Sequence, residues 1–283
     1  MKKQQMHLAV LMTTFAMAGL LSSCAPPAPT EVDVRVNNAR IVSLNPCTDA
    51  ILVDVAYPGQ VLALSHYSHD PASSSIPHDV ASQFPVTGGT VEEILALDPD
   101  MVLASSFLPP ATANALRDLD IPFRTFASPT SVSQNMAQVH YIGKLAGQSS
   151  SALSYAGMIS EAIRRNAAPP GHTPISTVLW QPGEIVPGEG ALISELMREA
   201  GFSSHSAALG MGQADYLPLE VLLAHPPELL LVAGNSRGQL HPALQQLENT
   251  RVETLDPSLL YCGGPTIIRA MERLAEIRTS MRS

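Results

Sequence analysis

The sequence predicts an α/β protein of two lobes, each built on a parallel sheet, with one long α-helix joining them and a ligand cleft between them. Three observations lead to this prediction. Short apolar runs typical of strands alternate with helical segments in both halves of the chain. A segment of the first half returns in similar form in the second half. A proline-free stretch with helical periodicity separates the two halves.

The composition excludes several classes of protein. The chain has 283 residues, 45 % hydrophobic and 14 % charged, so it can bury a large core and is not globally disordered. Its net charge of −9, without basic clusters, argues against nucleic-acid binding, because phosphate binding depends on cations. Three cysteines are too few for a disulfide-dense scaffold and provide no CxxC-type zinc module, and we expect neither a resident metal nor a cofactor.

The first 39 residues read as a targeting segment. Lys2 and Lys3 precede an apolar run over 8–21, which predicts a signal peptide over 1–23. The following Cys24 ends a word that resembles the lipobox of bacterial lipoproteins, which implies lipidation of Cys24 and a proline-rich tether over 24–39. The alternative is ordinary secretory cleavage near a chance cysteine. We therefore expect a periplasmic, membrane-anchored lipoprotein, in a compartment where disulfides persist.

The N-terminal lobe is predicted over 40–130. The expected strands are four short apolar runs, at 40–44, 61–64, 101–104 and 121–126. Asn45-Pro46 ends the first of them, and a helix is expected over 48–57. A second helix begins after Gly88-Gly89-Thr90, where two acids in the first turn suit the helix dipole.

The connecting segment is predicted over 131–168. It contains no proline, and its apolar residues recur at spacings of three and four. This pattern predicts one long helix, with Gly147-Gln148 as a candidate interruption. Pro169-Pro170 ends it.

The C-terminal lobe is predicted over 169–283, with a strand at 176–180 and a helix over 192–200. Residues 219–232 repeat the order of residues 91–104: an acid, an apolar helix, a proline, a second acid and a strand. We interpret the match as two lobes of similar architecture, and coincidence is the alternative. Ligands of open α/β sheets bind at the carboxyl ends of the strands, so two such Rossmann-like lobes place a cleft between them.

Three sequence segments resemble those of one known family. They are residues 40–49, residues 61–67, and the Gly88-Gly89 pair followed by residues 92–100. They resemble the substrate-binding proteins of ABC importers for vitamin B12, iron–siderophores and haem, the class with one long helix between its lobes. The resemblance runs from about Arg40 to Ile277.

The resemblance implies a monomeric binding protein, with no catalysis, that captures a bulky metal chelate and delivers it to a permease in the inner membrane. The segment at 40–49 is most similar to the cobalamin-binding branch of the family, so a corrinoid is the preferred ligand. Asn45 and Cys47 depart from the pattern of that branch. A ferric siderophore or haem is the alternative ligand. A non-transport ligand-sensing lipoprotein and a thiol oxidoreductase are the alternative functions, and the common hydrolase, nucleotide-binding and metalloprotease motifs are absent.

The candidate ligand-binding residues are those that follow predicted strands or belong to the segments that resemble the family. They are Pro46, Cys47, Tyr67, Gly88, Trp180, Tyr216, Tyr261 and Cys262. Flat aromatic side chains suit corrin, porphyrin or catecholate surfaces. For Trp180 the alternative is a core position, and His66 and His69 are interpreted as surface loop histidines.

Cys47 and Cys262 each lie between a predicted strand and a predicted helix, so both are expected near the cleft. Three readings stay open for them: a disulfide, a pair of soft ligands for the metal of the substrate, or two unpaired thiols.

Glu92 and Glu220 occupy matching positions in the repeat. The resemblance implies that one exposed acid per lobe contacts the permease. The alternative is an ordinary acid in the first turn of a helix.

Overall fold

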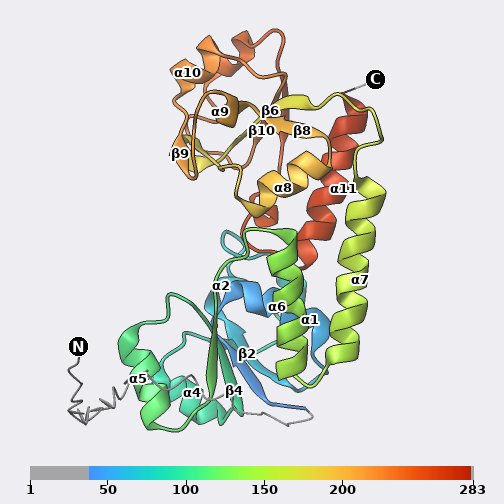
Figure 1. Ribbon diagram of the computed structural model, residues 1–283. Coiled ribbons are helices and arrows are strands. Elements are labelled where there is room, and N and C mark those ends of the chain that lie inside the picture. Colours follow the sequence, from blue (N-terminus) through green and yellow to red (C-terminus); the bar gives the residue numbers. More distant parts are fainter. Residues whose placement is uncertain (1–37, 282–283) are drawn as a thin grey trace, which may run out of the picture. The chain divides into compact units, whose positions relative to one another are not determined.

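The computed structural model describes residues 38–281 (Figure 1). The predicted signal peptide, Cys24 and most of the tether lie outside these residues. Within the described part of the chain, no helix is long and apolar enough to cross a membrane.

The N-lobe is built on five parallel strands in the order β3-β2-β1-β4-β5. The strands are β1 (Ile41–Ser43), β2 (Val61–Ser65), β3 (Val86–Thr87), β4 (Met101–Ser105) and β5 (Phe123–Phe126). Its helices are α1 (Pro46–Val55), α2 (His66–His69), α3 (His78–Ala81), α4 (Val91–Leu97) and α5 (Pro110–Asp118). Val42 and Val102 of the two central strands pack against Ile94 of α4 and Leu116 of α5, so these helices cover one face of the sheet.

The segment predicted as one helix over 131–168 is a helical hairpin. It consists of α6 (Val132–Leu145) and α7 (Ser149–Asn166), which lie side by side (Figure 1). Gly147 has a φ of +70°, which ends α6 and turns the chain back. A Cβ at Gly143 would lie 2.2 Å from Cβ of Ala152, so glycine is what permits the close approach of the two helices. The single long connection is therefore α7, and the candidate interruption lies at the turn.

The C-lobe has a four-stranded parallel sheet in the order β11-β10-β6-β8 and a two-stranded antiparallel ribbon, β7-β9. The strands are β6 (Ile175–Trp180), β7 (Ile185–Val186), β8 (Phe202–Ser204), β9 (Asp215–Tyr216), β10 (Leu229–Val232) and β11 (Arg251–Thr254). Its helices are α8 (Leu192–Glu199), α9 (His205–Ala208), α10 (Leu219–Ala224) and α11 (Pro265–Ser280). Three 3-10 turns complete it: η1 (Pro182–Glu184), η2 (Pro242–Gln246) and η3 (Pro257–Leu259). These two parallel sheets with their helices confirm the predicted fold class.

The sequence repeat occupies the same structural place in each lobe. In each lobe a helix, α4 or α10, leads into a strand, β4 or β10, that pairs with the first strand of its sheet. In each copy of the repeat, the acidic residue that follows the proline accepts a hydrogen bond from the backbone at the start of that first strand. Asp100 Oδ2 accepts from Arg40 N at 2.7 Å, and Glu228 Oε1 accepts from Ser176 N at 3.2 Å. The repeated acid thus satisfies a backbone N–H that the end of the ladder would otherwise leave open.

The C-terminal helix α11 joins the lobes a second time. It packs along α7 (Figure 1), and the loop before it reaches α6 and the N-lobe. There Gly264 N donates to Asn135 Oδ1 at 3.2 Å, and Ser75 Oγ donates to Ser258 O at 3.3 Å.

Candidate ligand-binding site

The carboxyl ends of β1 and β4 open into a hollow. These neighbouring strands mark the point where the strand order of the N-lobe reverses, which is where ligands of open α/β sheets bind. The hollow has a volume of about 590 Å³, and we call it the N-lobe hollow. Its lining comes from the carboxyl ends of β1 to β5 and the segments that follow them, and from Tyr261 in the segment before α11. The lining residues are Leu44, Asn45, Pro46, Cys47, Ser65, His66, Tyr67, Thr87, Gly88, Gly89, Ser105, Phe107, Leu108, Pro109, Thr112, Ser128 and Tyr261.

The short helix α2 holds an aromatic pair at this hollow. The rings of His66 and Tyr67 lie 4.0 Å apart, centroid to centroid, and Tyr67 is 49 % exposed. The side chain of Ser65 accepts from Tyr67 N at 3.2 Å and so caps the helix. Because the helix has only one turn, its position depends on contacts from outside.

Asp49 provides those contacts from inside α1. Its Oδ2 accepts from Ser65 N at 2.9 Å and from Ser68 Oγ at 2.6 Å, and the side chain is fully buried. Burial raises the pKa of Asp49 to about 7, and hydrogen bonds from Ser43, Ser68 and Ser65 offset this only in part. The carboxyl group therefore ties the segment that carries Tyr67 to the helix that carries Cys47.

The Gly88-Gly89 pair follows β3 at the wall of the same hollow. Gly89 has a φ of +81°, a conformation that favours glycine. Glu93 reaches back beneath the pair, accepting from Thr87 Oγ1 at 2.9 Å and from Thr90 N at 3.3 Å. These bonds hold the pKa of the Glu93 carboxyl below its usual range. With Glu93 engaged in the cap of α4, its neighbour Glu92 stays exposed on the outer surface.

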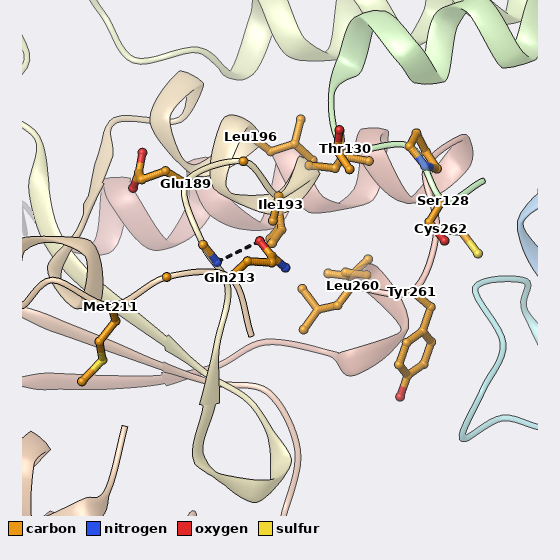
Figure 2. Close-up of a pocket in the computed structure, with 17 residues that line it drawn as sticks. Ser128, Thr130, Glu189, Ile193, Leu196, Met211, Gln213, Leu260, Tyr261 and Cys262 are labelled. Carbon is orange, nitrogen blue, oxygen red and sulfur yellow. Dashed lines mark hydrogen bonds between the residues drawn. The ribbon is translucent and has the colours of Figure 1, made fainter. Parts of the chain in front are cut away.

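A second hollow, of about 620 Å³, adjoins the first, and we call it the C-lobe hollow (Figure 2). Its wall is largely apolar, with Ile193 and Leu196 of α8 on one side. Gln213 crosses it, its Oε1 accepting from Gly188 N at 3.2 Å. The lining comes from both lobes: Ser128, Pro129, Thr130, Gly188, Glu189, Gly190, Ala191, Leu192, Ile193, Leu196, Met211, Gly212, Gln213, Leu259, Leu260, Tyr261 and Cys262.

A disulfide between Cys47 and Cys262 stands where the two hollows meet. The Cα atoms are 5.0 Å apart, and the two residues are separated by 215 positions in sequence. Cys47 lines the N-lobe hollow and Cys262 the C-lobe hollow, while Ser128 and Tyr261 line both. The two hollows therefore adjoin, with Ser128, Tyr261 and the disulfide at their boundary.

Most of the predicted ligand-binding residues lie at these hollows. Pro46, Cys47, Tyr67 and Gly88 line the N-lobe hollow, and Cys262 lines the C-lobe hollow. Tyr261, which is 41 % exposed, lines both.

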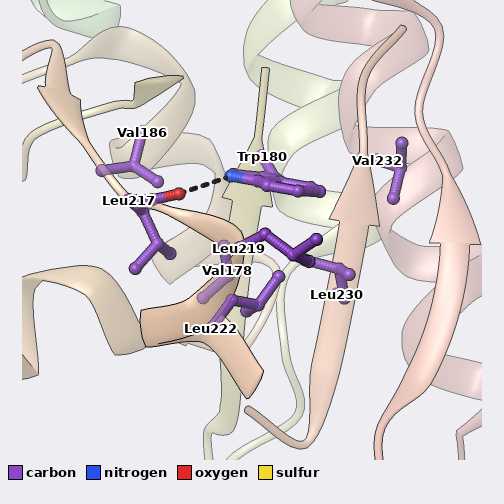
Figure 3. Close-up of a cluster of buried hydrophobic side chains, with 8 residues drawn as sticks. All are labelled: Val178, Trp180, Val186, Leu217, Leu219, Leu222, Leu230 and Val232. Atoms are coloured by element: carbon purple, nitrogen blue, oxygen red, sulfur yellow. Dashed lines mark hydrogen bonds between the residues drawn. The ribbon is translucent and has the colours of Figure 1, made fainter. Parts of the chain in front are cut away.

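Trp180 is the main exception. It was expected to point into the cleft, but it is fully buried and lines neither hollow (Figure 3). Its Nε1 donates to Leu217 O at 3.0 Å, and Gln239 Nε2 donates to the Trp180 carbonyl at 2.8 Å. The reason is that the strand end of the C-lobe sheet is covered by the chain itself, through Leu217 next to β9 and the loop that carries Gln239.

Tyr216 is the second exception. It lies on β9, where it pairs with Ile185 of β7, and it lines neither hollow. Its side chain is 56 % exposed, and a hydrogen bond with Glu184 raises the pKa of its hydroxyl.

Many lining residues were not foreseen, and Phe107, Ser128 and Gln213 are examples. Phe107 is 87 % exposed, the largest exposure among the large hydrophobic side chains in the described residues. It follows β4 directly, so the strand-end rule could have found it. Ser128 likewise follows β5. Gln213 lies in a loop without any pattern that marks it.

Glu92 and Glu220 are both exposed, and each is the second residue of its helix, α4 or α10. Neither lines a hollow. They occupy corresponding positions on the outer surface of the two lobes.

Comparisons with known proteins agree on the class. The model of the periplasmic binding protein family matches residues 41–253, and the chain belongs to this family. A search of curated protein sequences finds no match.

Solved structures share the fold. The periplasmic haem-binding protein HutB of Vibrio cholerae superposes with a TM-score of 0.70 at 17 % identity, covering 85 % of this chain and 99 % of that one. The haem-binding protein RhuT of Roseiflexus reaches 0.67 at 20 % identity, covering 86 % and 97 %. The vitamin B12-binding protein BtuF of Vibrio cholerae reaches 0.64 at 17 % identity, covering 87 % and 99 %.

Proposed function

We propose that this protein is the extracytoplasmic substrate-binding component of an ABC importer, and that it captures a bulky metal chelate without catalysis. The observation that carries the proposal is the pair of adjoining hollows, one at the strand ends of the N-lobe and one beside α8 of the C-lobe, with volumes of about 590 and 620 Å³. Membership of the periplasmic binding protein family supports it. Each hollow alone is within the range of small-molecule sites, and the pair suits a ligand larger than a sugar or an amino acid.

For the ligand, we retain a corrinoid as the first choice and haem or a ferric siderophore as the alternative. Tyr67, Phe107 and Tyr261 present aromatic surface at the N-lobe hollow, which suits a flat macrocycle. The similar structures include proteins described as haem-binding and one described as binding vitamin B12, so both choices have a precedent on this fold.

The remaining parts of the proposal concern the cell surface. A periplasmic location follows from the family, and the lipid anchor at Cys24 stays a prediction. Delivery to a permease in the inner membrane would use Glu92 and Glu220, one from each lobe, with the protein acting as a monomer.

Calorimetric titration with cyanocobalamin, haemin and ferric siderophores tests the proposal. We expect one of the three classes to bind one-to-one at micromolar concentration or below. Because Trp180 is buried away from the site, heat or ligand absorbance is a better signal than its fluorescence. A protein that binds none of these chelates, or that converts one of them chemically, contradicts the proposal.

A further inference from the structure

The two hollows contain almost no charge. No arginine or lysine contributes to either lining. The only carboxylate is that of Glu189, and Arg198 binds it at 2.7 Å. His66 is the only histidine in either lining. A ligand with several negative charges would therefore lose its hydration here without gaining a cationic partner.

Two arginines outside the linings, Arg198 and Arg269, are bound to groups of the protein. Arg198 donates to both the carboxylate and the carbonyl of Glu189. Arg269 of α11 donates to the carbonyl of Ser75.

The helix starts at the site supply no full positive charge. α1 and α5 begin with Pro46 and Pro110, and each proline removes one N–H group from the first turn of its helix. Asn45 Oδ1 already accepts from Cys47 N at 2.9 Å. α8 carries Glu195 in its first turn, whose charge opposes the positive end of the helix. The protein as a whole has a net charge of −9, so its long-range field also repels anions.

We infer that the site is selective for metal chelates that are neutral or positively charged, and that it discriminates against polyanionic chelates such as ferric tris-catecholates and carboxylate-rich complexes. This inference rests on the proposed function and adds a charge class to the substrate. Selection follows from a wall of aromatic, aliphatic and uncharged polar groups, which accepts a macrocycle or a neutral hydroxamate complex.

Matched ligand pairs test the inference, because each pair keeps the metal ion and its coordination number and changes the charge of the chelate. The pairs are cyanocobalamin with a carboxylate derivative of one of its amide side chains, haemin dimethyl ester with haemin, and a neutral ferric tris-hydroxamate with a ferric tris-catecholate. In the pair whose chelate class binds, we expect the less anionic member to bind at least tenfold more tightly. Its Kd should change less than twofold between 20 and 200 mM salt, because no ion pair is screened.

Two variants sharpen the test. Ser128 lines both hollows and is exposed, so Ser128→Lys places a cation at the site, and we expect it to shift the ratio of affinities toward the anionic member by about tenfold. Arg237 is exposed on the loop after β10, outside both linings, so Arg237→Gln is the matched control and should leave the ratio unchanged.

The outcomes separate the two proposals. Equal or tighter binding of the anionic member by the unmodified protein overturns the charge inference alone. So does a loss of anion binding in the Arg237→Gln variant, since it would identify a cation that serves the site. Absence of binding by every probe overturns the proposed function, and the charge inference with it.

Discussion

Asp49 is a buried acid whose ionisation has a cost that depends on pH. The pKa of its carboxyl is about 7 in the folded protein, against an ordinary value of 3.8. The folded protein therefore holds this proton more tightly than the unfolded chain, so the associated stability is complete below pH 3.8 and is lost as the pH rises through 7. Between pH 5 and pH 8, Asp49 alone should lower the free energy of unfolding by on the order of 3 kcal/mol.

The variant Asp49→Asn keeps the acceptor oxygen for Ser65 N and Ser68 Oγ but cannot ionise. We expect it to lose that fall in stability, measured by urea unfolding at pH 5 and pH 8. The exposed Asp79 supplies the control, Asp79→Asn, which should keep the pH dependence of the unmodified protein. If Asp49→Asn and the unmodified protein respond equally to pH, the carboxyl is already ionised in the fold.

The positions of candidate residues at the hollows were predicted best for residues that directly follow a strand. Pro46, Cys47 and Tyr67 lie at the N-lobe hollow because each follows a strand whose end is open. Trp180 also ends a strand, but Leu217 and Gln239, which lie 37 and 59 positions away, cover it. No local pattern shows that a distant segment will fold back over a strand end.

Among the elements, short patterns were more informative than long ones. The motif of acid, helix, proline and acid predicted α4-β4 and α10-β10, because Asp100 and Glu228 each bind the first strand of their own sheet. The periodicity over 131–168 continued through the turn at Gly147, because both α6 and α7 bury one face. Helical periodicity predicts which face of each helix is buried, but it does not predict that the chain reverses direction between two helices.

The disulfide links two elements, the start of α1 and the loop before α11. Closing a loop of 215 positions should stabilise the fold by roughly 5 kcal/mol on chain-entropy grounds. We expect the double variant Cys47→Ser/Cys262→Ser to unfold at a lower urea concentration. Its free energy of unfolding should fall by several kcal/mol at most. Reductant should shift the unmodified protein in the same direction and leave the variant unchanged.

Mass spectrometry of the mature chain gives an independent check. Alkylation before reduction should modify neither Cys47 nor Cys262, and alkylation after reduction should modify both. Modification of both residues before reduction would show two free thiols. It would then support the alternative hypothesis that the two thiols contact the ligand.

At the scale of the whole molecule, the lobes are connected more than once. α7 links them through the main chain, α11 packs along α7, and the disulfide joins the N-lobe to the segment before α11. Gly264 N and Asn135 Oδ1 add a buried hydrogen bond at the same joint. These connections favour a small opening movement, so the proposed recognition by a permease would depend on surfaces that are present in both the closed and the open protein.

Glu92 and Glu220 are the residues that we expect to serve that recognition, since each is exposed near the start of the repeated helix of its lobe. Reversing both charges, with Glu92→Lys and Glu220→Lys together, should reduce uptake of the bound chelate by cells at least tenfold. Each single change should have a smaller effect, because one contact remains. The Kd for the chelate should stay within twofold, because neither residue lines a hollow.

The control for this experiment is an exposed acid elsewhere, Glu272 of α11. Glu272→Lys makes the same change in net charge as either single variant without touching α4 or α10, so uptake should be preserved. Equal losses in the control and the double variant would indicate a general effect of charge. Unchanged uptake in the double variant would mean that the permease recognises other residues. A loss confined to the double variant would assign docking to the two repeated helices, and so give the sequence repeat a function beyond anchoring the central strands.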